Sequence, residues 1–211
     1  MPRATRSPAA ESGAGHRDAL DALGLEGEVR RRLEAYLEVL SRWNPRVNLT
    51  AARTPEARVR LLVAPGLVAG PWVVPGRLLD VGSGNGSPGL VLALLREDVQ
   101  AVLLEPRQRR WAFLKEGARA AGRPEVEVLR LRHDAYVGPA ADTVTLRGLA
   151  LPLSALRPLA RVGGRVIVFG GHPAEEPPFR REGTVPLGRG HLHVFLRAAA
   201  APPSPGVPRE T

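Results

Sequence analysis

The stretch DVGSGNGSPG at residues 80–89 constrains this chain most, because alternate glycines follow directly on a short apolar run. Glycine is required where a backbone turns sharply or approaches a ligand closely, since a Cβ would collide there. Residues 77–81 predict a strand and residues 87–95 a helix, with Pro88 tolerated in its first turn. A glycine turn in this position predicts a ligand-binding loop rather than a purely structural one.

From residue 77 onward the sequence alternates between strand and helix patterns. Further strands are predicted at residues 100–104, 126–130, 143–146 and 164–169. Helices are predicted at 106–121 and, interrupted by two prolines, at 149–160. Residues 183–187 and 191–197 flank a glycine-bearing turn and predict an antiparallel hairpin. These units imply an α/β fold with a mostly parallel sheet flanked by helices, whose ligands bind beyond the carboxyl ends of the strands.

The rest of the chain divides into regions that differ in the spacing of their apolar residues and in composition. Residues 17–75 show helical spacing of apolar side chains and predict an N-terminal helical cap, followed by a ligand-binding domain at 76–198. One cap helix is expected to end near Asn44, because Pro45 disfavours helical geometry in the residue before it. Residues 1–16 and 199–211 are polar or proline-rich, and we expect a disordered arm and tail there.

Composition narrows the classes of function. The net charge is +9, from 30 basic and 21 acidic residues, and only Lys115 is a lysine. Such a balance attracts polyanions, nucleic acid first, although arginine codons in a GC-rich genome would give the same composition. The chain has no cysteine and five scattered histidines, so we expect no metal site. Prolines and glycines break the longest apolar stretch, residues 61–74, so no membrane span and a cytoplasmic location are expected.

Two cofactors fit the glycine loop. Gly84, Gly86 and Gly89 match the dinucleotide fingerprint, which leaves a nicotinamide-dependent oxidoreductase as one reading. Two features favour S-adenosylmethionine instead. Asp80 ends the first strand, where a carboxylate can meet the methionine ammonium or order water near the sulfonium. A helical cap also precedes the glycine-bearing strand and a hairpin closes the sheet, as in Rossmann-like class I methyltransferases.

Other strand ends supply candidate contacts. Glu105 ends the second strand, where it would accept hydrogen bonds from ribose hydroxyls with either cofactor. His133 and Asp134 follow the third strand, where the adenine of the cofactor would lie. Asp134 is placed to accept a hydrogen bond from the adenine amino group, unless this segment is only a surface loop.

Several segments together resemble the RsmG family, also called glucose-inhibited division protein B. They are WNPRVNLTA at 43–51, the loop at 80–89, LLE at 103–105, DTVTLRGLA at 142–150 and GHLHV at 190–194. The resemblance covers roughly residues 33–198, and WNPRVNLTA is its most discriminating part, because a generic methyltransferase does not require it. Members of that family methylate N7 of a guanine in bacterial small-subunit (16S) ribosomal RNA.

The resemblance implies a set of site residues and a partner. The resemblance places cofactor contacts at Gly82, Ser87, His133, Asp134 and Arg147, and Glu105 matches the family's acidic strand end. Asp80, Gly84 and Gly86 complete the expected cofactor contacts from the pattern of the loop itself. Arg147 would also be the catalytic residue, at the mouth of the pocket, where a guanidinium can meet a phosphate or a guanine edge. The expected partner is 16S ribosomal RNA or the small ribosomal subunit, bound by a monomer. RNA contacts are expected at Arg42, Arg46, Arg53, Arg107, Arg109 and Arg110.

The chain departs from the family pattern at a few positions. Ser87 stands where a bulky apolar residue is usual, and Gly148 stands where an alanine is usual. Residues 61–64 are apolar where a histidine and an aspartate are usual, and residues 169–171 read Phe-Gly-Gly in place of Lys-Gly. An RNA-binding relative without catalysis is therefore the alternative to an enzyme.

Methylation of N7 would need alignment but no general base, because N7 carries no proton.

Overall fold

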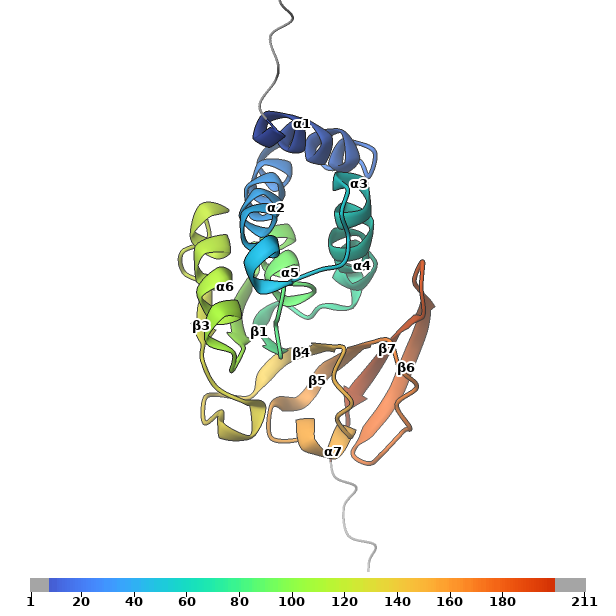
Figure 1. Cartoon of the computed structure of the whole chain (residues 1–211). Coiled ribbons are helices and arrows are strands. Elements are labelled where there is room, and N and C mark those ends of the chain that lie inside the picture. The colour runs from blue at the N-terminus through green and yellow to red at the C-terminus, as the bar shows by residue number, and fades with distance from the viewer. Residues whose placement is uncertain (1–7, 200–211) are drawn as a thin grey trace, which may run out of the picture.

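The computed structural model describes residues 8–199, in which seven strands form one sheet in the order β3-β2-β1-β4-β5-β7-β6 (Figure 1). The first five strands run parallel, and β7 pairs antiparallel with both β5 and β6. This order confirms the predicted α/β class with its closing hairpin. The strands are β1 (Gly76–Val81), β2 (Val99–Leu104), β3 (Glu127–Leu129), β4 (Ala141–Arg147), β5 (Ala160–Phe169), β6 (Phe179–Pro186) and β7 (His191–Arg197).

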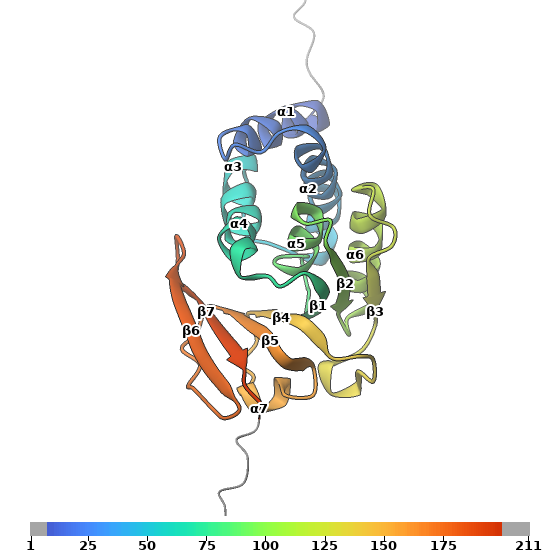
Figure 2. The ribbon, with the colours of Figure 1, turned by 180° about the vertical axis from the view of Figure 1, so that it is seen from behind.

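Helices cover the two faces of the sheet unequally (Figures 1 and 2). Because strand side chains alternate between faces, Leu78 and Leu103 join one core cluster and Leu79 and Leu104 the other. The larger cluster packs against α2 (Gly27–Val47), α4 (Ala64–Ala69), α5 (Gly89–Leu95) and α6 (Gln108–Ala120). The smaller cluster is closed by the short helix α7 (Leu153–Leu156) and the loop after β3. Among residues 8–199, no helix combines the length and apolar character needed to cross a membrane.

The first helix, α1 (Pro8–Asp21), corrects the expectation of a disordered arm up to residue 16. It packs on α3 (Pro55–Arg58): a Cβ built on Gly15 would lie 2.9 Å from Cγ of Pro55. The side chains of His16 and Leu20 are fully buried. The helical structure of α1 depends on contacts with residues that are distant in sequence, and local composition does not reveal such contacts. The remainder of the predicted arm, residues 1–7, and the predicted tail from residue 200 lie outside the described residues.

Helix α2 continues through Pro45 to Val47, so the predicted end near Asn44 was wrong. A proline in the last turn only removes one backbone donor. The chain leaves the helix at Asn48, which adopts a left-handed φ of 52° and donates to the Asn44 carbonyl at 2.9 Å. The buried Asn44 amide then holds the next residues: Oδ1 accepts from the backbone N–H groups of Leu49 and Thr50, at 2.8 and 2.9 Å, and Nδ2 donates to the Thr50 carbonyl at 3.0 Å.

The helix predicted at residues 149–160 is limited to the four residues of α7. Pro152 precedes it and Pro158 follows it, so only one turn fits between them. Strand β5 then begins at Ala160, four residues earlier than predicted, because this segment pairs with β4 from Ala141 onward.

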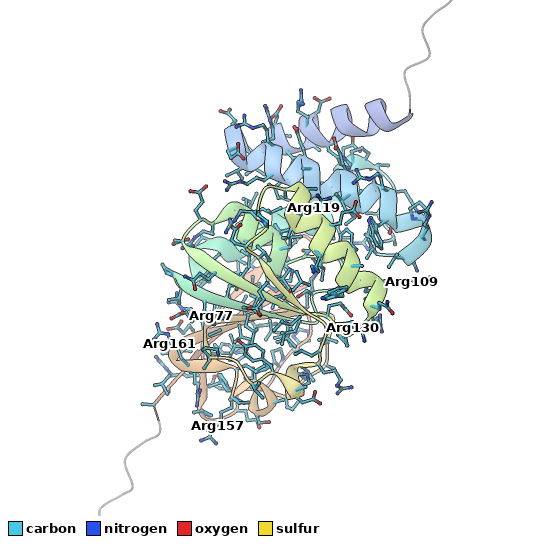
Figure 3. All side chains as sticks on the ribbon, turned by 90° about the vertical axis from the view of Figure 1, so that its left-hand side faces the viewer. Arg77, Arg109, Arg119, Arg130, Arg157 and Arg161 are labelled. Carbon is cyan, nitrogen blue, oxygen red and sulfur yellow. The ribbon has the colours of Figure 1, made fainter. Side chains whose placement is uncertain are left out.

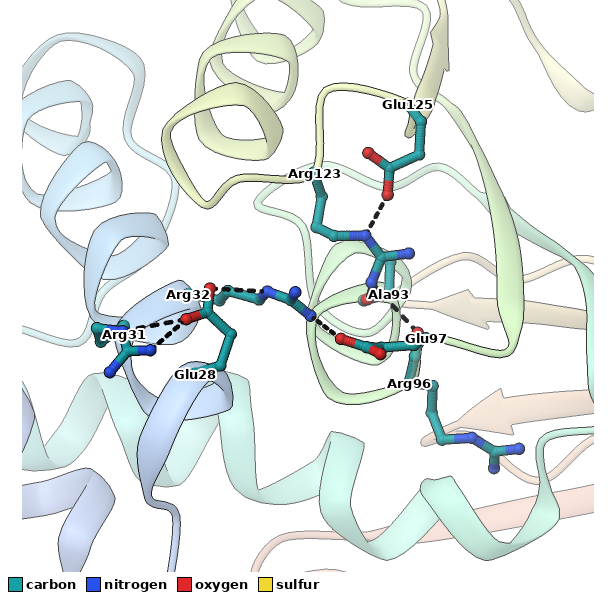
Figure 4. Close-up of polar contacts among 8 residues, drawn as sticks. All are labelled: Glu28, Arg31, Arg32, Ala93, Arg96, Glu97, Arg123 and Glu125. Carbon is teal, nitrogen blue, oxygen red and sulfur yellow. Dashed lines mark hydrogen bonds and ion pairs between the residues drawn. The ribbon is translucent and has the colours of Figure 1, made fainter.

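Arginines spread over the surface and also brace the fold. Figure 3 shows labelled arginines from Arg109 and Arg119 on α6 down to Arg157 beyond α7. Partly buried Arg32 of α2 pairs with the exposed carboxylates of Glu28 and of Glu97 in the α5–β2 loop (Figure 4). Arg123 is buried and donates to the Ala93 carbonyl near the C-terminus of α5 (Figure 4). The helical cap and α6 are thereby tied to α5, the helix that follows the glycine loop.

Replacement of Asn44 by alanine is expected to lower the free energy of unfolding by about 2–4 kcal/mol, because two buried N–H groups and one carbonyl lose their partners. Urea denaturation would measure the loss. Asn48→Gly is the matched control, since glycine accepts the left-handed φ at this exposed position, and a change within about 0.5 kcal/mol is expected. Equal effects of the two substitutions would contradict the role given to the Asn44 amide.

Candidate cofactor and substrate site

A cavity of about 370 Å³ opens at the carboxyl ends of β1, β2 and β4. In a parallel sheet this edge is where ligands bind. The cavity brings together four of the predicted cofactor residues, Gly82, Glu105, His133 and Arg147. It is also lined by Arg107 and Arg110, which were predicted to contact RNA.

The three glycines of the loop have different structural roles. Gly82 lines the cavity with φ +72°, and a Cβ there would lie 2.5 Å from Cδ1 of Leu149 across the opening. Gly86, with φ +89°, faces the helical cap instead, where a Cβ would lie 3.2 Å from Cε2 of Tyr36. Gly84 contributes its backbone N–H to Glu105. Gly82 therefore permits the Leu149 side chain to lie directly against the loop at the cavity wall, whereas Gly86 permits close packing against α2.

Glu105 is buried, with 3% of its surface exposed, and is held by backbone donors on both sides. Gly84 N–H donates to Oε2 at 3.0 Å, and Arg107 N–H donates to Oε1 at 2.8 Å. A carboxylate offers about four acceptor positions, so each oxygen keeps one more for a ligand. The side chain is thus oriented in advance to accept from a pair of hydroxyl groups.

Asp80 lies beneath the glycine loop rather than in the cavity lining. A Cβ at Gly89 would overlap its side chain, so α5 begins directly against this carboxyl group. Thr145 Oγ1 donates to Oδ1 at 2.6 Å, whereas the buried Oδ2 has no hydrogen-bond partner among the described residues. Burial raises the pKa of Asp80 to about 6, although the Thr145 hydrogen bond opposes this rise.

The loop after β3 separates the predicted pair His133 and Asp134. His133 lines the cavity, but Asp134 is exposed and pairs with Arg132 at 3.4 Å. Sequence reasoning missed the apolar wall of the cavity, which consists of Leu131, Leu149 and Leu151. Their only signal is their position just after β3 and β4, at the same sheet edge as the glycine loop.

Arg147 ends β4 and lines the cavity without a carboxylate partner among the described residues. Its Nη1 donates to Oγ of Ser87 at 2.9 Å and to the Leu61 carbonyl at 3.0 Å. Burial lowers the pKa of this guanidinium below its ordinary value. The Ser87 hydroxyl donates to the Leu62 carbonyl at 2.7 Å, so it points to the helical cap and is not part of the lining expected for a cofactor contact.

The predicted RNA-binding arginines fall into three places. Arg42, Arg46 and Arg109 surround a second, wider hollow between the end of α2 and the start of α6. Glu116 holds two side chains at the rim of this hollow: it pairs with Arg42 at 3.0 Å and accepts a hydrogen bond from Nε1 of Trp43 at 2.8 Å. Arg107 and Arg110 line the first cavity, and Arg53 is exposed but lines neither hollow.

Within residues 8–199, no three histidine or carboxylate side chains are placed to share a metal ion.

A family model described as rRNA small subunit methyltransferase G matches residues 29–181. The chain belongs to this family. Two relatives, both named ribosomal RNA small subunit methyltransferase G, support the assignment. The protein of Xanthomonas campestris pv. campestris is 34% identical over 155 residues, covering 73% of this chain and 71% of the relative. That of Methylobacillus flagellatus is 35% identical over 158 residues, covering 73% and 77%.

Solved structures show the same fold. An RNA methyltransferase from Salinibacter ruber in complex with S-adenosyl-L-homocysteine has a TM-score of 0.53 at 21% identity, covering 67% of this chain and 93% of that one. A putative methyltransferase from Escherichia coli has a TM-score of 0.55 at 18% identity, covering 72% and 92%. The predicted class I methyltransferase fold is therefore confirmed.

The raised pKa of Asp80 makes stability depend on pH. The folded state favours the protonated carboxyl up to about pH 6, against an ordinary value of 3.8, so the protein should lose about 3 kcal/mol of stability as pH rises through this interval. Asp80→Asn cannot ionise and should lack that loss. Urea midpoints between pH 4 and pH 7, without cofactor, measure the difference, with exposed Asp134→Asn as control. Parallel profiles for wild type and Asp80→Asn would show the assignment to be wrong.

Proposed function

We propose that this chain transfers a methyl group from S-adenosylmethionine to N7 of a guanine in 16S ribosomal RNA, acting in the cytoplasm. One observation carries the proposal: in a member of this family, a single cavity joins Gly82, the pre-oriented Glu105 and Arg147, a cation with no carboxylate partner among residues 8–199. The cavity therefore pairs a carboxylate suited to a ribose with a cation suited to an RNA group.

The cavity residues fit S-adenosylmethionine. Glu105 would hold the ribose hydroxyls with its two remaining acceptor positions. The leucine wall and His133 would enclose the adenine, and the backbone at Gly82, which lines the cavity, would face the methionine part. The bound cofactor supplies an electrophilic methyl group on a sulfonium. Asp80 would favour this positive charge from beneath the loop.

On the substrate side the chain needs only to orient the base. Arg147 makes both of its described hydrogen bonds through Nη1, which leaves Nε and Nη2 able to donate to a ligand. A guanidinium can donate to guanine O6 or to a phosphate while N7 stays free to attack. Because N7 carries no proton, alignment of N7 with the methyl group and the sulfur is sufficient. The arginines of both hollows would hold the RNA backbone.

The decisive experiment supplies unmodified small subunits or naked 16S ribosomal RNA together with methyl-labelled S-adenosylmethionine, and then maps the labelled base. The proposal requires label on one guanine, removed by treatment that cleaves at N7-methylguanine. RNA binding without incorporation would support the inactive relative instead. Calorimetry with S-adenosylhomocysteine and NAD separates the two cofactors, since binding of NAD alone would favour the oxidoreductase.

Arg147→Ala is expected to lower turnover about 30- to 100-fold, because it removes charged hydrogen bonds to the substrate. The affinity for S-adenosylhomocysteine, measured by calorimetry, should change only a few-fold. Arg147→Lys keeps the charge without the fork of donors and should recover only part of the rate. Unchanged methylation by Arg147→Ala would remove Arg147 from the proposed site.

Arg109→Gln is expected to weaken RNA binding and to lower the slope of log affinity against log salt by about 0.7–0.9, the contribution of one phosphate contact. Arg109 projects from α6 beside the second hollow, whereas Arg157 lies at the bottom of the view in Figure 3 and lines neither hollow. Arg157→Gln therefore serves as the control with equal charge loss. Filter-binding titrations at several salt concentrations measure both, and identical slopes for the two variants would argue against the second hollow as an RNA site.

A further inference from the structure

One hydroxyl group connects the glycine loop, the helical cap and the end of β4. Oγ of Ser87 donates to the Leu62 carbonyl at 2.7 Å and accepts from Nη1 of Arg147 at 2.9 Å, in a position only 4% exposed. We propose that Ser87 is a positioning residue that holds the Arg147 guanidinium toward the substrate. This inference rests on the proposed function, in which Arg147 contacts the RNA.

The backbone of the cap explains why carbonyl groups are available at this point. Residues Val59–Val63 form a π-helical turn that leads into α4. Pro65 stands four residues after Leu61 and has no N–H group, so the Leu61 carbonyl cannot receive the ordinary helical hydrogen bond. It accepts from Nη1 of Arg147 at 3.0 Å instead. Irregular turns of this kind occur often at functional sites.

The partners of Arg147 fix its geometry without neutralising its charge. A hydroxyl and a backbone carbonyl are neutral acceptors, whereas a carboxylate would form an ion pair and compete with an anionic substrate. Burial lowers the pKa of Arg147, and Asp80 and Tyr36 oppose this effect only from a distance. The guanidinium is therefore held in one orientation with its charge still available to a phosphate or a guanine edge.

The hydrogen-bond partners of Ser87 argue against a cofactor contact by its side chain. Its single proton is donated to Leu62, it accepts from Arg147, and Ser87 is not among the residues that line the cavity. Loss of the hydroxyl should therefore disturb the substrate step more than cofactor binding. This separates a positioning role from a cofactor contact.

A double-mutant cycle tests the proposal with Ser87→Ala, Arg147→Ala and the combined variant. Ser87→Ala should lower kcat/KM for ribosomal RNA about five- to tenfold, the effect of one lost hydrogen bond, while affinity for S-adenosylhomocysteine stays within about twofold. In the Arg147→Ala background, Ser87→Ala should add no further loss. Ser41→Ala is the matched control, because Ser41 likewise donates to a backbone carbonyl and accepts from an arginine, Arg58, within the cap.

An additive loss in the combined variant, or a loss of S-adenosylhomocysteine affinity equal to the loss of activity, would overturn the proposal. A second readout does not depend on activity: the Arg147 Nε–H signal of ¹⁵N-labelled protein, identified by its absence in Arg147→Ala. Its exchange with water should accelerate several-fold in Ser87→Ala but not in Ser41→Ala, and unchanged exchange would also overturn the proposal. If the wild-type protein methylates no RNA, the proposed function fails, while this signal still decides whether Ser87 holds Arg147.

Discussion

The buried amide of Asn44 is the interaction on which the geometry of the site depends. It satisfies three backbone groups of Leu49 and Thr50 and so sets the path of the chain after α2. The Leu49 carbonyl then accepts from Nδ2 of Asn85 at 3.2 Å, and the Tyr36 hydroxyl donates to the Asn85 carbonyl at 2.7 Å. The glycine loop is therefore shaped from above by the helical cap as well as from below by the sheet. This is a physical reason for the WNPRVNLTA segment, which a bare Rossmann-like domain would not need.

Three charged groups at the sheet edge are stabilised in three different ways. Glu105 receives two backbone N–H groups, which fix the orientation of its carboxylate. Asp80 has only the Thr145 hydroxyl, and burial raises its pKa. Arg147 has neutral acceptors and no carboxylate partner among the described residues. The site thus keeps both signs of charge incompletely compensated, which suits a cationic cofactor and an anionic substrate that supply the missing partners.

The parts of the site that were predictable from sequence are those set by local patterns. The strand, glycine loop and helix around Gly82, and the strand-end position of Glu105, follow from spacing alone. The direction of the Ser87 hydroxyl was not predictable, because its partners Leu62 and Arg147 are distant in sequence. The same holds for the order of residues 8–16, which depends on packing against α3, and for the leucine wall, which the ends of β3 and β4 bring together.

The residues that depart from the family pattern lie near one side chain in the structure. Ser87 and Leu61 both accept from the Arg147 guanidinium, Gly148 follows Arg147 directly, and Phe169 is its register partner on β5. Four changes that are scattered along the sequence therefore surround one side chain. The loop that carries Gly82, Gly84 and Gly86 keeps the family pattern, and so does Glu105. The departures are therefore concentrated around Arg147 and not around Glu105 or the glycines of the loop.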